Sequence, residues 1–311
     1  MSNIPKNKAI ITAAVTGSVH TPTMSPHLPV TAQQIIDDIM TAYEAGAAVA
    51  HVHVREENTG RPNADQDIYR RILSEVKKRC DMVLCPTTGG RLGEPMENRS
   101  KVVTNLRPEL ASLNAGSLNF VLSHVADNYH EWRHDWEEDY LRGTEDFIFP
   151  NTFYTIRKFV EAMNQHDTRP EFEVYDVGMI NNLAQLIHDS HIKTPVYLQF
   201  VMGIMGGIPA TVEHLIHLLD TARRQLGQFH WSVCAAGRFQ FPLTTHALLL
   251  GGNARVGLED NLYLEKGVLA KNSGEQVAKI IRIARELGIE PATPSEAREM
   301  LGLKGLDKVG Y

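Results

Sequence analysis

Residues 31–55 read TAQQIIDDIMTAYEAGAAVAHVHVR, and this stretch joins a helix to the strand that follows it. Thr31 and Gln34 form a capping box ahead of isoleucines at helical spacing, and Gly46 is typical of the position just past a helix end. Residues 48–54 then form an almost continuous apolar run of strand length. The stretch therefore predicts one helix and strand unit of an α/β protein.

Short apolar runs of this kind recur along the chain with helical stretches between them. The eight expected strands are residues 10–15, 48–54, 82–85, 110–113, 172–175, 196–201, 231–234 and 254–258. Strands that alternate with helices pair in parallel through right-handed crossovers, and eight units fit a closed (β/α)8 TIM barrel better than an open sheet. A doubly wound α/β fold is the alternative, and the lack of a GxGxxG fingerprint after the first strand counts against it.

Two further helices are expected after the eighth strand. Ser273 with Gln276 repeats the capping-box pattern, and the segment 293–296, TPSE, places proline at the first helical position. The prediction is a single TIM-barrel domain over residues 1–311 with additional C-terminal helices.

Residues 121–149 interrupt the alternation after the fourth expected strand. This segment holds Trp132, Trp136 and several acidic residues. Because the loops that follow barrel strands surround the catalytic end, we expect the insertion to rise from that face as a lid or a subunit contact. The equal alternative is an extra surface helix, with tryptophans four residues apart packing it onto its neighbours.

The composition excludes several kinds of partner. The net charge is −6 and no Lys/Arg block occurs, so neither nucleic acid nor an anionic membrane surface is expected as a partner. The apolar run at 9–15, interrupted by Thr12, is too short for a secretory or membrane segment. Cys80, Cys85 and Cys234 lack CxxC spacing, which argues against disulfides and a thiolate zinc site. A cytoplasmic protein that acts on small molecules is expected.

His51 and His53 give the sharpest chemical signal, because they lie two residues apart at the end of an apolar strand. Side chains two apart on a strand point to the same side, so both imidazoles can reach one metal ion at about 2.0–2.1 Å. The alternative is a pair of hydrogen-bonded core histidines. It would require a satisfied partner for each buried ring.

Residues 255–261, RVGLEDN, follow the eighth expected strand and supply charges to the same rim. Glu259 can be the third metal ligand, and two histidines with one carboxylate leave an open position, as in catalytic zinc sites. Asp260 is then free to act as a base, and Arg255 can hold a carboxylate or steady developing negative charge. An Arg–Asp salt bridge that closes the barrel is the alternative.

Polar residues at three other strand ends are candidates for substrate binding. They are Thr87, Thr88, Gly89, Ser112, Asn114 and Glu173. Two hydroxyls and a glycine-exposed backbone can cradle a carboxylate or a phosphate, although ordinary loops contain such sequences. An interior carboxylate on the fifth strand is costly unless it meets a cation, a metal or a substrate.

Several blocks occur together in a specific order: ITAAVTG, AHVHVR, the TTGG loop, ASLNAGSLNF, GRFQFP and RVGLEDN. Over residues 9–303 the chain resembles the β-keto acid cleavage enzyme family, represented by 3-keto-5-aminohexanoate cleavage enzyme. The resemblance implies a zinc-dependent (β/α)8 barrel, usually homotetrameric. It also implies an acyltransferase that condenses a β-keto acid with acetyl-CoA and releases acetoacetate and a new acyl-CoA.

The resemblance assigns roles to the residues already singled out. It implies His51, His53 and Glu259 as zinc ligands, and Arg255 and Asp260 as catalytic residues. It also implies Thr87, Thr88 and Gly89 as the loop for the substrate carboxylate and Ser112 as a polar contact after the fourth strand.

One position departs from the family pattern. The members that cleave aminohexanoate carry an acidic residue after the first strand, where this chain has Val19. An acid suited to a substrate amine is therefore absent, and the substrate side chain is left open between an uncharged and a quaternary-ammonium group.

Two other functions compete with this prediction. A metal-dependent aldolase or lyase would use the same residues without acetyl-CoA. A non-catalytic barrel with a structural zinc is the third possibility, and an open coordination position would count against it.

Overall fold

Eight parallel strands form the central sheet of the computed structural model, which describes residues 7–90 and 93–311. In chain order they are β2 (Ile11–Ala14), β3 (Val49–Val52), β6 (Val83–Pro86), β7 (Leu110–Asn114), β10 (Arg169–Val174), β11 (Val196–Met202), β12 (Phe229–Ala235) and β13 (Asn253–Val256). All eight predicted strands are confirmed.

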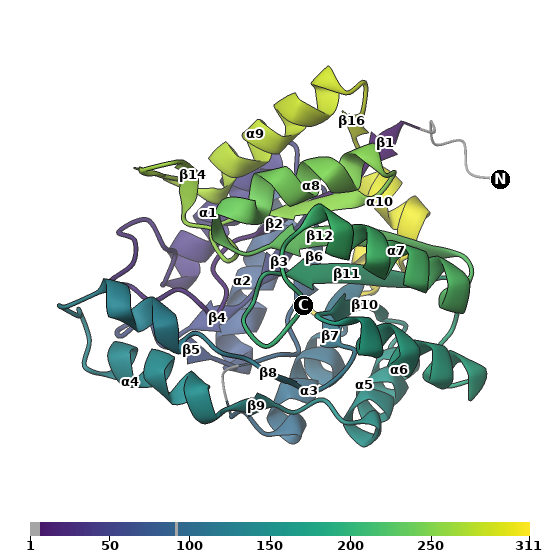
Figure 1. Cartoon of the computed structure of the whole chain (residues 1–311), viewed down its shortest axis with the longest axis horizontal. Helices are drawn as coiled ribbons and strands as arrows, with labels where there is room; N and C mark the ends of the chain where they lie inside the picture. Colours follow the sequence, from purple (N-terminus) through teal and green to yellow (C-terminus); the bar gives the residue numbers. More distant parts are fainter. Residues whose placement is uncertain (1–6, 91–92) are drawn as a thin grey trace.

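The strands follow one another around the sheet in the order β6-β3-β2-β13-β12-β11-β10-β7. The two end strands, β6 and β7, also lie next to each other, so the sheet curls into a nearly closed barrel (Figure 1). A sequential order of this kind belongs to a (β/α)8 barrel, whereas a doubly wound sheet reverses direction from its middle. The barrel prediction is therefore confirmed, and the doubly wound alternative is wrong.

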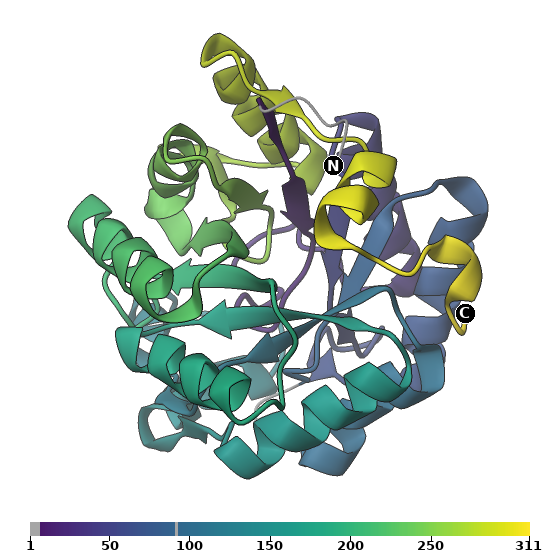
Figure 2. The same ribbon diagram turned by 90° about the vertical axis from the view of Figure 1, so that its right-hand side faces the viewer.

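One helix follows each barrel strand and covers it from outside, as Figure 2 shows. These helices are α1 (Ala32–Glu44), α2 (Gln66–Arg79), α3 (Met96–Leu106), α5 (Phe153–Gln165), α6 (Val177–His188), α7 (Val212–Leu226), α8 (Gln240–Leu249) and α9 (Ser273–Glu286). Their apolar stripes face the sheet, and in α1 this stripe contains the buried Ile35, Ile36 and Ile39. None of the helices in the described ranges has the length and apolar character needed to cross a bilayer.

The predicted cap of α1 is confirmed, and that of α9 is wrong by one residue. Thr31 and Gln34 form the capping box of α1. At α9 the N-cap is Asn272, whose side chain accepts a hydrogen bond from the backbone N–H of Glu275. Ser273 is instead used by a tertiary contact, because its backbone N–H and hydroxyl donate to the buried carboxylate of Asp38 at 2.8 and 2.6 Å.

The additional C-terminal helix, α10 (Pro294–Leu301), closes the end of the barrel at which the strands begin. The predicted proline at its first helical position is confirmed, and Thr293 and Glu296 also form a capping box. Ala297 and Leu301 pack with Ile10 and Leu110 in an apolar cluster at this end. Beside it, β1 (Lys8–Ala9) pairs in parallel with β16 (Glu290–Pro291).

The insertion predicted at residues 121–149 lies between two short strands of its own, β8 (Leu118–Asn119) and β9 (Ile148–Phe149), which pair antiparallel. It contains the 3-10 turns η1 (Ser123–Asn128) and η2 (Gly143–Asp146) around the helix α4 (Trp136–Arg142). Only Trp136 lies on that helix, and Trp132 precedes it and packs against Tyr129 with the rings tilted by 44° and their centroids 5.5 Å apart. The two tryptophans therefore do not share one helix face.

Two hairpins complete the end of the barrel at which the strands finish. Strands β4 (Val54–Arg55) and β5 (Pro62–Asn63) form the first hairpin, directly after β3. Strands β14 (Tyr263–Glu265) and β15 (Val268–Leu269) form the second hairpin, after β13.

Candidate active site

A cavity of about 740 Å³ opens at the carboxyl ends of the barrel strands. The predicted site residues that line it are His53, Thr87, Gly89, Glu173, Arg255, Glu259 and Asp260. His51, Thr88, Ser112 and Asn114 are buried in the wall behind this lining. In a (β/α)8 barrel this is the end at which catalytic residues from different strands converge.

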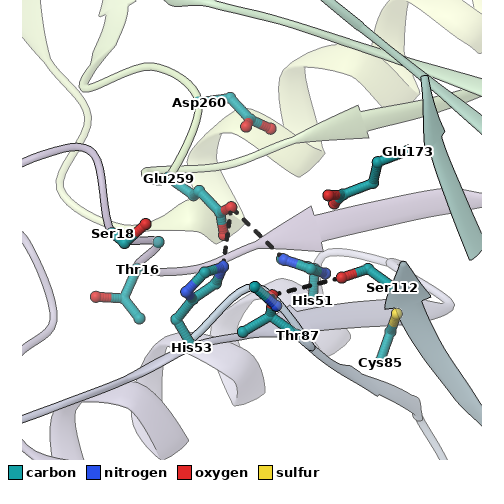
Figure 3. A network of polar contacts seen from close by, with 12 residues as sticks. Thr16, Ser18, His51, His53, Cys85, Thr87, Ser112, Glu173, Glu259 and Asp260 are labelled. Carbon is teal, nitrogen blue, oxygen red and sulfur yellow. Dashed lines mark hydrogen bonds and ion pairs between the residues drawn. The ribbon is translucent and has the colours of Figure 1, made fainter. Parts of the chain in front are cut away.

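His51, His53 and Glu259 meet at the floor of the cavity (Figure 3). Oε1 of Glu259 lies 3.6 Å from Nε2 of His51 and 3.4 Å from Nε2 of His53. Two ligands bound at about 2.1 Å to a tetrahedral zinc ion are about 3.4 Å apart, so these separations suit a shared ion. Oε2 of Glu259 is buried and has no hydrogen-bond partner among the described residues, which leaves it free to bind a cation.

Two glycines let the chain place Glu259 at this point. A Cβ on Gly257 would stand 2.0 Å from the carbonyl oxygen of Ala14, so only glycine allows the segment after β13 to cross so close to β2. A Cβ on Gly17, whose φ is +62°, would stand 2.3 Å from Cγ of Glu259. Glycine at both positions therefore makes room for Glu259 beside the two histidines.

Arg255 is buried beside these ligands and is shared by three carboxylates. Its NH2 donates to Oε1 of Glu259 at 2.7 Å and to Oδ1 of Asp260 at 2.9 Å, and its Nε donates to Oδ2 of Asp260 at 3.0 Å. Its NH1 lies 3.6 Å from Glu173. The Arg–Asp salt bridge considered from the sequence does form, and it lies on the cavity floor next to the histidines.

Protonation states at the floor suit metal binding. Burial lowers the pKa of His51 well below its usual value, so the ring is neutral and can ligate. Burial alone would raise the pKa of Glu259, but Arg255 and the two imidazoles outweigh it and hold that pKa well below its usual range. Burial raises the pKa of Asp260 to about 6 and that of Glu173 to about 8, in each case against the opposing pull of Arg255.

The polar residues at the third and fourth strand ends divide into two groups. Thr87 faces the cavity, and its Oγ1 accepts a hydrogen bond from the backbone N–H of Gly89 at 2.8 Å and from Oγ of Ser112 at 3.4 Å. Thr88 points the other way and donates its hydroxyl to the carbonyl of Ser112 at 2.7 Å. Asn114 is buried, and its Oδ1 has no partner among the described residues.

Sequence reasoning gave no role to Arg55, although Arg55 ends the HVHVR motif. The side chain is fully buried, and its Nε donates to Oγ1 of Thr16 at 2.7 Å. Its other nitrogens donate to the backbone carbonyls of Thr16, Gly17, His20 and Gly60. Arg55 therefore fixes the loop after β2, which brings Ser18, Val19 and His20 to the cavity.

The insertion also reaches the cavity, which sequence reasoning anticipated only as a general position. Val121, Leu122, His124, Val125 and Asn128 line the opening. The insertion is joined to the loop after β2, because the hydroxyl of Tyr140 donates to the carbonyl of Ser18 at 2.9 Å. A carboxylate oxygen of Glu137 accepts from the backbone N–H of Thr23 at 3.0 Å.

The model of the β-keto acid cleavage enzymes matches residues 8–303 of this chain. The chain belongs to the β-keto acid cleavage enzyme family. The family resemblance inferred from the sequence motifs is thus confirmed over nearly the same residues.

Relatives in the β-keto acid cleavage enzyme family match along almost their whole length. A Paraburkholderia graminis protein named 3,5-dioxohexanoate:acetyl-CoA acetone transferase is 44% identical over 98% of this chain and 99% of its own. A 3-keto-5-aminohexanoate cleavage enzyme from Acetoanaerobium sticklandii is 39% identical over 95% of this chain and 98% of its own. Among solved structures, apo ObcA has a TM-score of 0.73 at 22% identity, over 90% of this chain and 66% of the ObcA chain, which supports the fold alone.

Proposed function

We propose that this member of the family is a zinc-dependent enzyme that uses acetyl-CoA to cleave a β-keto acid, releasing acetoacetate and a new acyl-CoA. The observation that carries the proposal is the meeting of His51, His53 and Glu259 with the Arg255 and Asp260 pair on one cavity floor. The name of the Paraburkholderia relative, an acetyl-CoA acetone transferase, supports the same reaction class.

Zinc is the ion that the donor set favours. Two imidazole nitrogens and one carboxylate leave a coordination position open, which is typical of catalytic zinc. When bound, the ion would polarise the substrate ketone and make the neighbouring carbon a stronger acid. The cavity connects this position to the opening of the barrel, since His53 and Glu259 both line it.

Asp260 is the proposed base. Arg255 holds both of its oxygens, and burial raises its pKa to about 6, close to the neutral range in which a general base works well. Asp260 removes a proton from the carbon between the ketone and the carboxylate. That carbon attacks the thioester carbonyl of acetyl-CoA, and the CoA thiolate leaves.

The second half of the reaction restores Asp260. The thiolate adds to the original ketone, and the bond between that carbonyl carbon and the neighbouring carbon that attacked acetyl-CoA breaks. The electron pair passes to the acetoacetate fragment, which takes back the proton from Asp260. The other fragment leaves as a new acyl-CoA, so atoms and charge balance without a further reactant.

The remaining predicted residues fit the binding of the substrate carboxylate. Thr87 faces the cavity with Ser112 behind it, whereas the unpaired Oδ1 of Asn114 is an acceptor and suits a donor group of the substrate instead of its carboxylate. Thr88 and Gly89 act indirectly, by fixing the loop that carries Thr87. Glu173, with its pKa raised by burial to about 8, is a neutral carboxyl near pH 7 that can donate a hydrogen bond to substrate.

The walls above the floor favour an uncharged substrate side chain. Val19, Phe120 and Phe149 line this region, and among the described residues the acids of the cavity are confined to the floor. Arg238, which also lines the cavity, opposes a positive substituent on the substrate. We therefore propose a neutral, apolar group on the ketone in preference to the quaternary ammonium left open by the sequence.

The insertion 121–149 is proposed to act as the cover of this cavity, because it lines the opening and is joined to the loop that carries Ser18. We also propose the cytoplasmic location expected from the composition of the chain. The family resemblance implies a homotetramer, which we propose as well. Light scattering on the purified protein would test the tetramer.

The deciding experiment is mass-spectrometric detection of new acyl-CoA species. The zinc-loaded protein is mixed with acetyl-CoA and a panel of β-keto acids that carry neutral, amino, trimethylammonio or carboxylate side chains, with His51→Ala as the control. We expect a new acyl-CoA from a neutral acid, absent from the control and absent without acetyl-CoA. Cleavage without acetyl-CoA would establish the aldolase alternative, and no product from any acid would refute the proposed reaction.

A further inference from the structure

A layer of polar side chains lies inside the barrel beneath the cavity floor, and the proposed reaction uses none of it. Its members come from five strands and are at most 1% exposed: Thr12, Cys85, Glu171, Tyr197 and Ser232. The hydroxyl of Tyr197 interacts with the hydroxyls of Ser232 and Thr12, whereas Oε2 of Glu171 has no hydrogen-bond partner within the described residues. Buried polar atoms are costly when unpaired, so this oxygen calls for a role.

His51 connects this layer to the metal site. Its Nε2 lies on the side of Glu259, 3.6 Å from Oε1, whereas its Nδ1 is buried without a partner among the described residues. One ring nitrogen of His51, Sγ of Cys85 and one carboxylate oxygen of Glu171 lie within 4.8 Å of one another. In Figure 3 the His51 ring lies between Glu259 and Cys85. Since Nε2 is turned toward Glu259, Nδ1 lies on the side of Cys85, whose thiol is hydrogen-bonded to Glu171.

The tautomer of His51 decides whether this residue can ligate. If Nε2 binds the ion, the ring proton must be on Nδ1, and a buried Nδ1–H needs an acceptor. Cys85 does not fill that need, because its thiol donates to Oε1 of Glu171 at 3.8 Å. Oε2 of Glu171 has no partner in the described chain. An ionised carboxylate oxygen is an acceptor and never a donor, so this oxygen suits the Nδ1–H of His51.

We propose that Glu171 is a positioning residue for the metal site, whose carboxylate accepts a hydrogen bond from Nδ1–H of His51 and so directs the Nε2 lone pair toward the ion. One bridging water or a small rotation of the Glu171 side chain closes the gap between the two groups. The proposal rests on the proposed function, because it needs His51 to be a zinc ligand. Carboxylates that orient ligating histidines in this way are a general feature of metal sites.

Zinc affinity tests this role independently of turnover. The dissociation constant for Zn²⁺ is measured by competition with a chromophoric chelator for the wild type, Glu171→Gln, Glu171→Asp and Glu109→Gln. Glu109→Gln is the matched control, because Glu109 is also a fully buried carboxylate but lies at the opposite end of the barrel, paired with Arg298. We expect Glu171→Gln to raise the dissociation constant by about 10- to 100-fold, and Glu109→Gln to change it by less than about twofold.

The stability of the metal-free protein separates positioning from a structural role. Glu171→Gln removes a buried carboxylate to which no cation of the described chain is directly bound, so the metal-free variant should unfold at or above the wild-type denaturant midpoint. Weaker zinc binding with undiminished metal-free stability would support the proposal. If Glu171→Gln does not fold, Glu171→Asp keeps the charge at a greater distance from His51 and should bind zinc more weakly than the wild type.

Three results would overturn the proposal. An unchanged zinc affinity in the Glu171 variants would remove Glu171 from the metal site while leaving the site itself intact. An equal loss in Glu109→Gln would show that zinc binding merely follows the overall stability. A wild type that binds no zinc would refute the proposed metal site and this role together.

Discussion

Each end of the barrel has an arginine paired with buried carboxylate groups, and the two clusters differ in how completely they are paired. Where the strands begin, Nε and NH2 of Arg298 donate to the two oxygens of Glu109, both at 2.8 Å. Where the strands finish, Arg255 is shared by Glu173, Glu259 and Asp260, and its NH1 and Oε2 of Glu259 have no hydrogen bond within the described residues.

The difference shows what each end is built to hold. One cation and one anion with all of the carboxylate oxygens filled make a finished pair that needs nothing further. One cation among three carboxylates leaves the other end with excess negative charge whenever all three are ionised, and a divalent ion between Glu259 and the histidines would balance it. Stability is therefore concentrated at the first end and chemistry at the second.

Removing one of the proposed metal ligands should have the largest effect on the cluster around Arg255. His51→Ala takes away one of the three donors, so we expect loss of bound zinc and a fall in kcat/KM of at least about 10³-fold, equivalent to about 4 kcal/mol of transition-state stabilisation. Zinc content and steady-state kinetics check both. His246→Ala, on the outer helix α8, should keep zinc and activity. A His51 variant that retained both would exclude His51 as a ligand.

Changing the proposed base should separate chemistry from metal binding within the same cluster. Asp260→Asn keeps the shape of the side chain but removes its basicity, so kcat should fall by about 10²- to 10⁴-fold while zinc content is unchanged. Asp189→Asn on the surface is the control. Unaltered turnover would contradict proton removal by Asp260.

Breaking the pair formed by Glu109 and Arg298 should lower the stability of the protein and leave catalysis unchanged. Glu109→Gln leaves Arg298 without its buried anion and should lower the free energy of unfolding by about 3–5 kcal/mol. Denaturant unfolding of the zinc-loaded protein measures this, and kcat/KM should stay near the wild-type value. A large fall in kcat/KM at unchanged stability would mean that the two ends are coupled.

Asp38 offers an intermediate case, because two donors from Ser273 reach it but no cation among the described residues is bound to it. Burial raises its pKa to about 6, above the value of about 3.9 for an unfolded chain. Between pH 4 and 6 the folded protein therefore holds more protons than the unfolded chain. The stabilising contribution of Asp38 to the free energy of unfolding is thus fully present below about pH 4 and is lost as the pH passes about 6.

Asp38→Asn should remove this dependence. Relative to the wild type, the free energy of unfolding of the variant should rise by at most about 3 kcal/mol between pH 4 and 6, the smallest effect expected here. Denaturant titrations at several pH values measure the difference. If the free energies of unfolding of the wild type and the variant changed with pH in the same way, the two donors of Ser273 would compensate fully for the burial of Asp38.

The sequence predicted the strands and the rim charges because both depend on local order. His51 and His53 share a side of the chain by the alternation of a strand, and RVGLEDN follows a strand whose end must lie at the same rim. The same alternation places Glu171 and Glu173 inside the barrel, but it does not say that one is in the cavity and the other beneath it. Which of the two glutamates reaches the cavity depends on the position of β10 along the barrel axis.

Contacts between distant loops escaped prediction for a related reason. Arg55 ends a recognisable motif, yet most of its acceptors are backbone carbonyls, which exist at every residue and leave no mark in the sequence. The cap of α9 was displaced to Asn272 because Asp38, 235 residues away, claims both donors of Ser273. Long-range partners of this kind become visible only once the barrel is closed.

The bonds between the insertion and the first loop constrain how substrate preference can be redesigned. The carbonyl of Ser18 and the backbone N–H of Thr23 find their partners on Tyr140 and Glu137. Replacing only one of the two segments with that of another family member would leave a hydrogen-bond donor or acceptor of the remaining segment without its partner. The two segments therefore form one exchangeable cassette, and libraries that recombine residues 16–23 and 121–149 together should yield more folded variants than libraries that exchange either one separately.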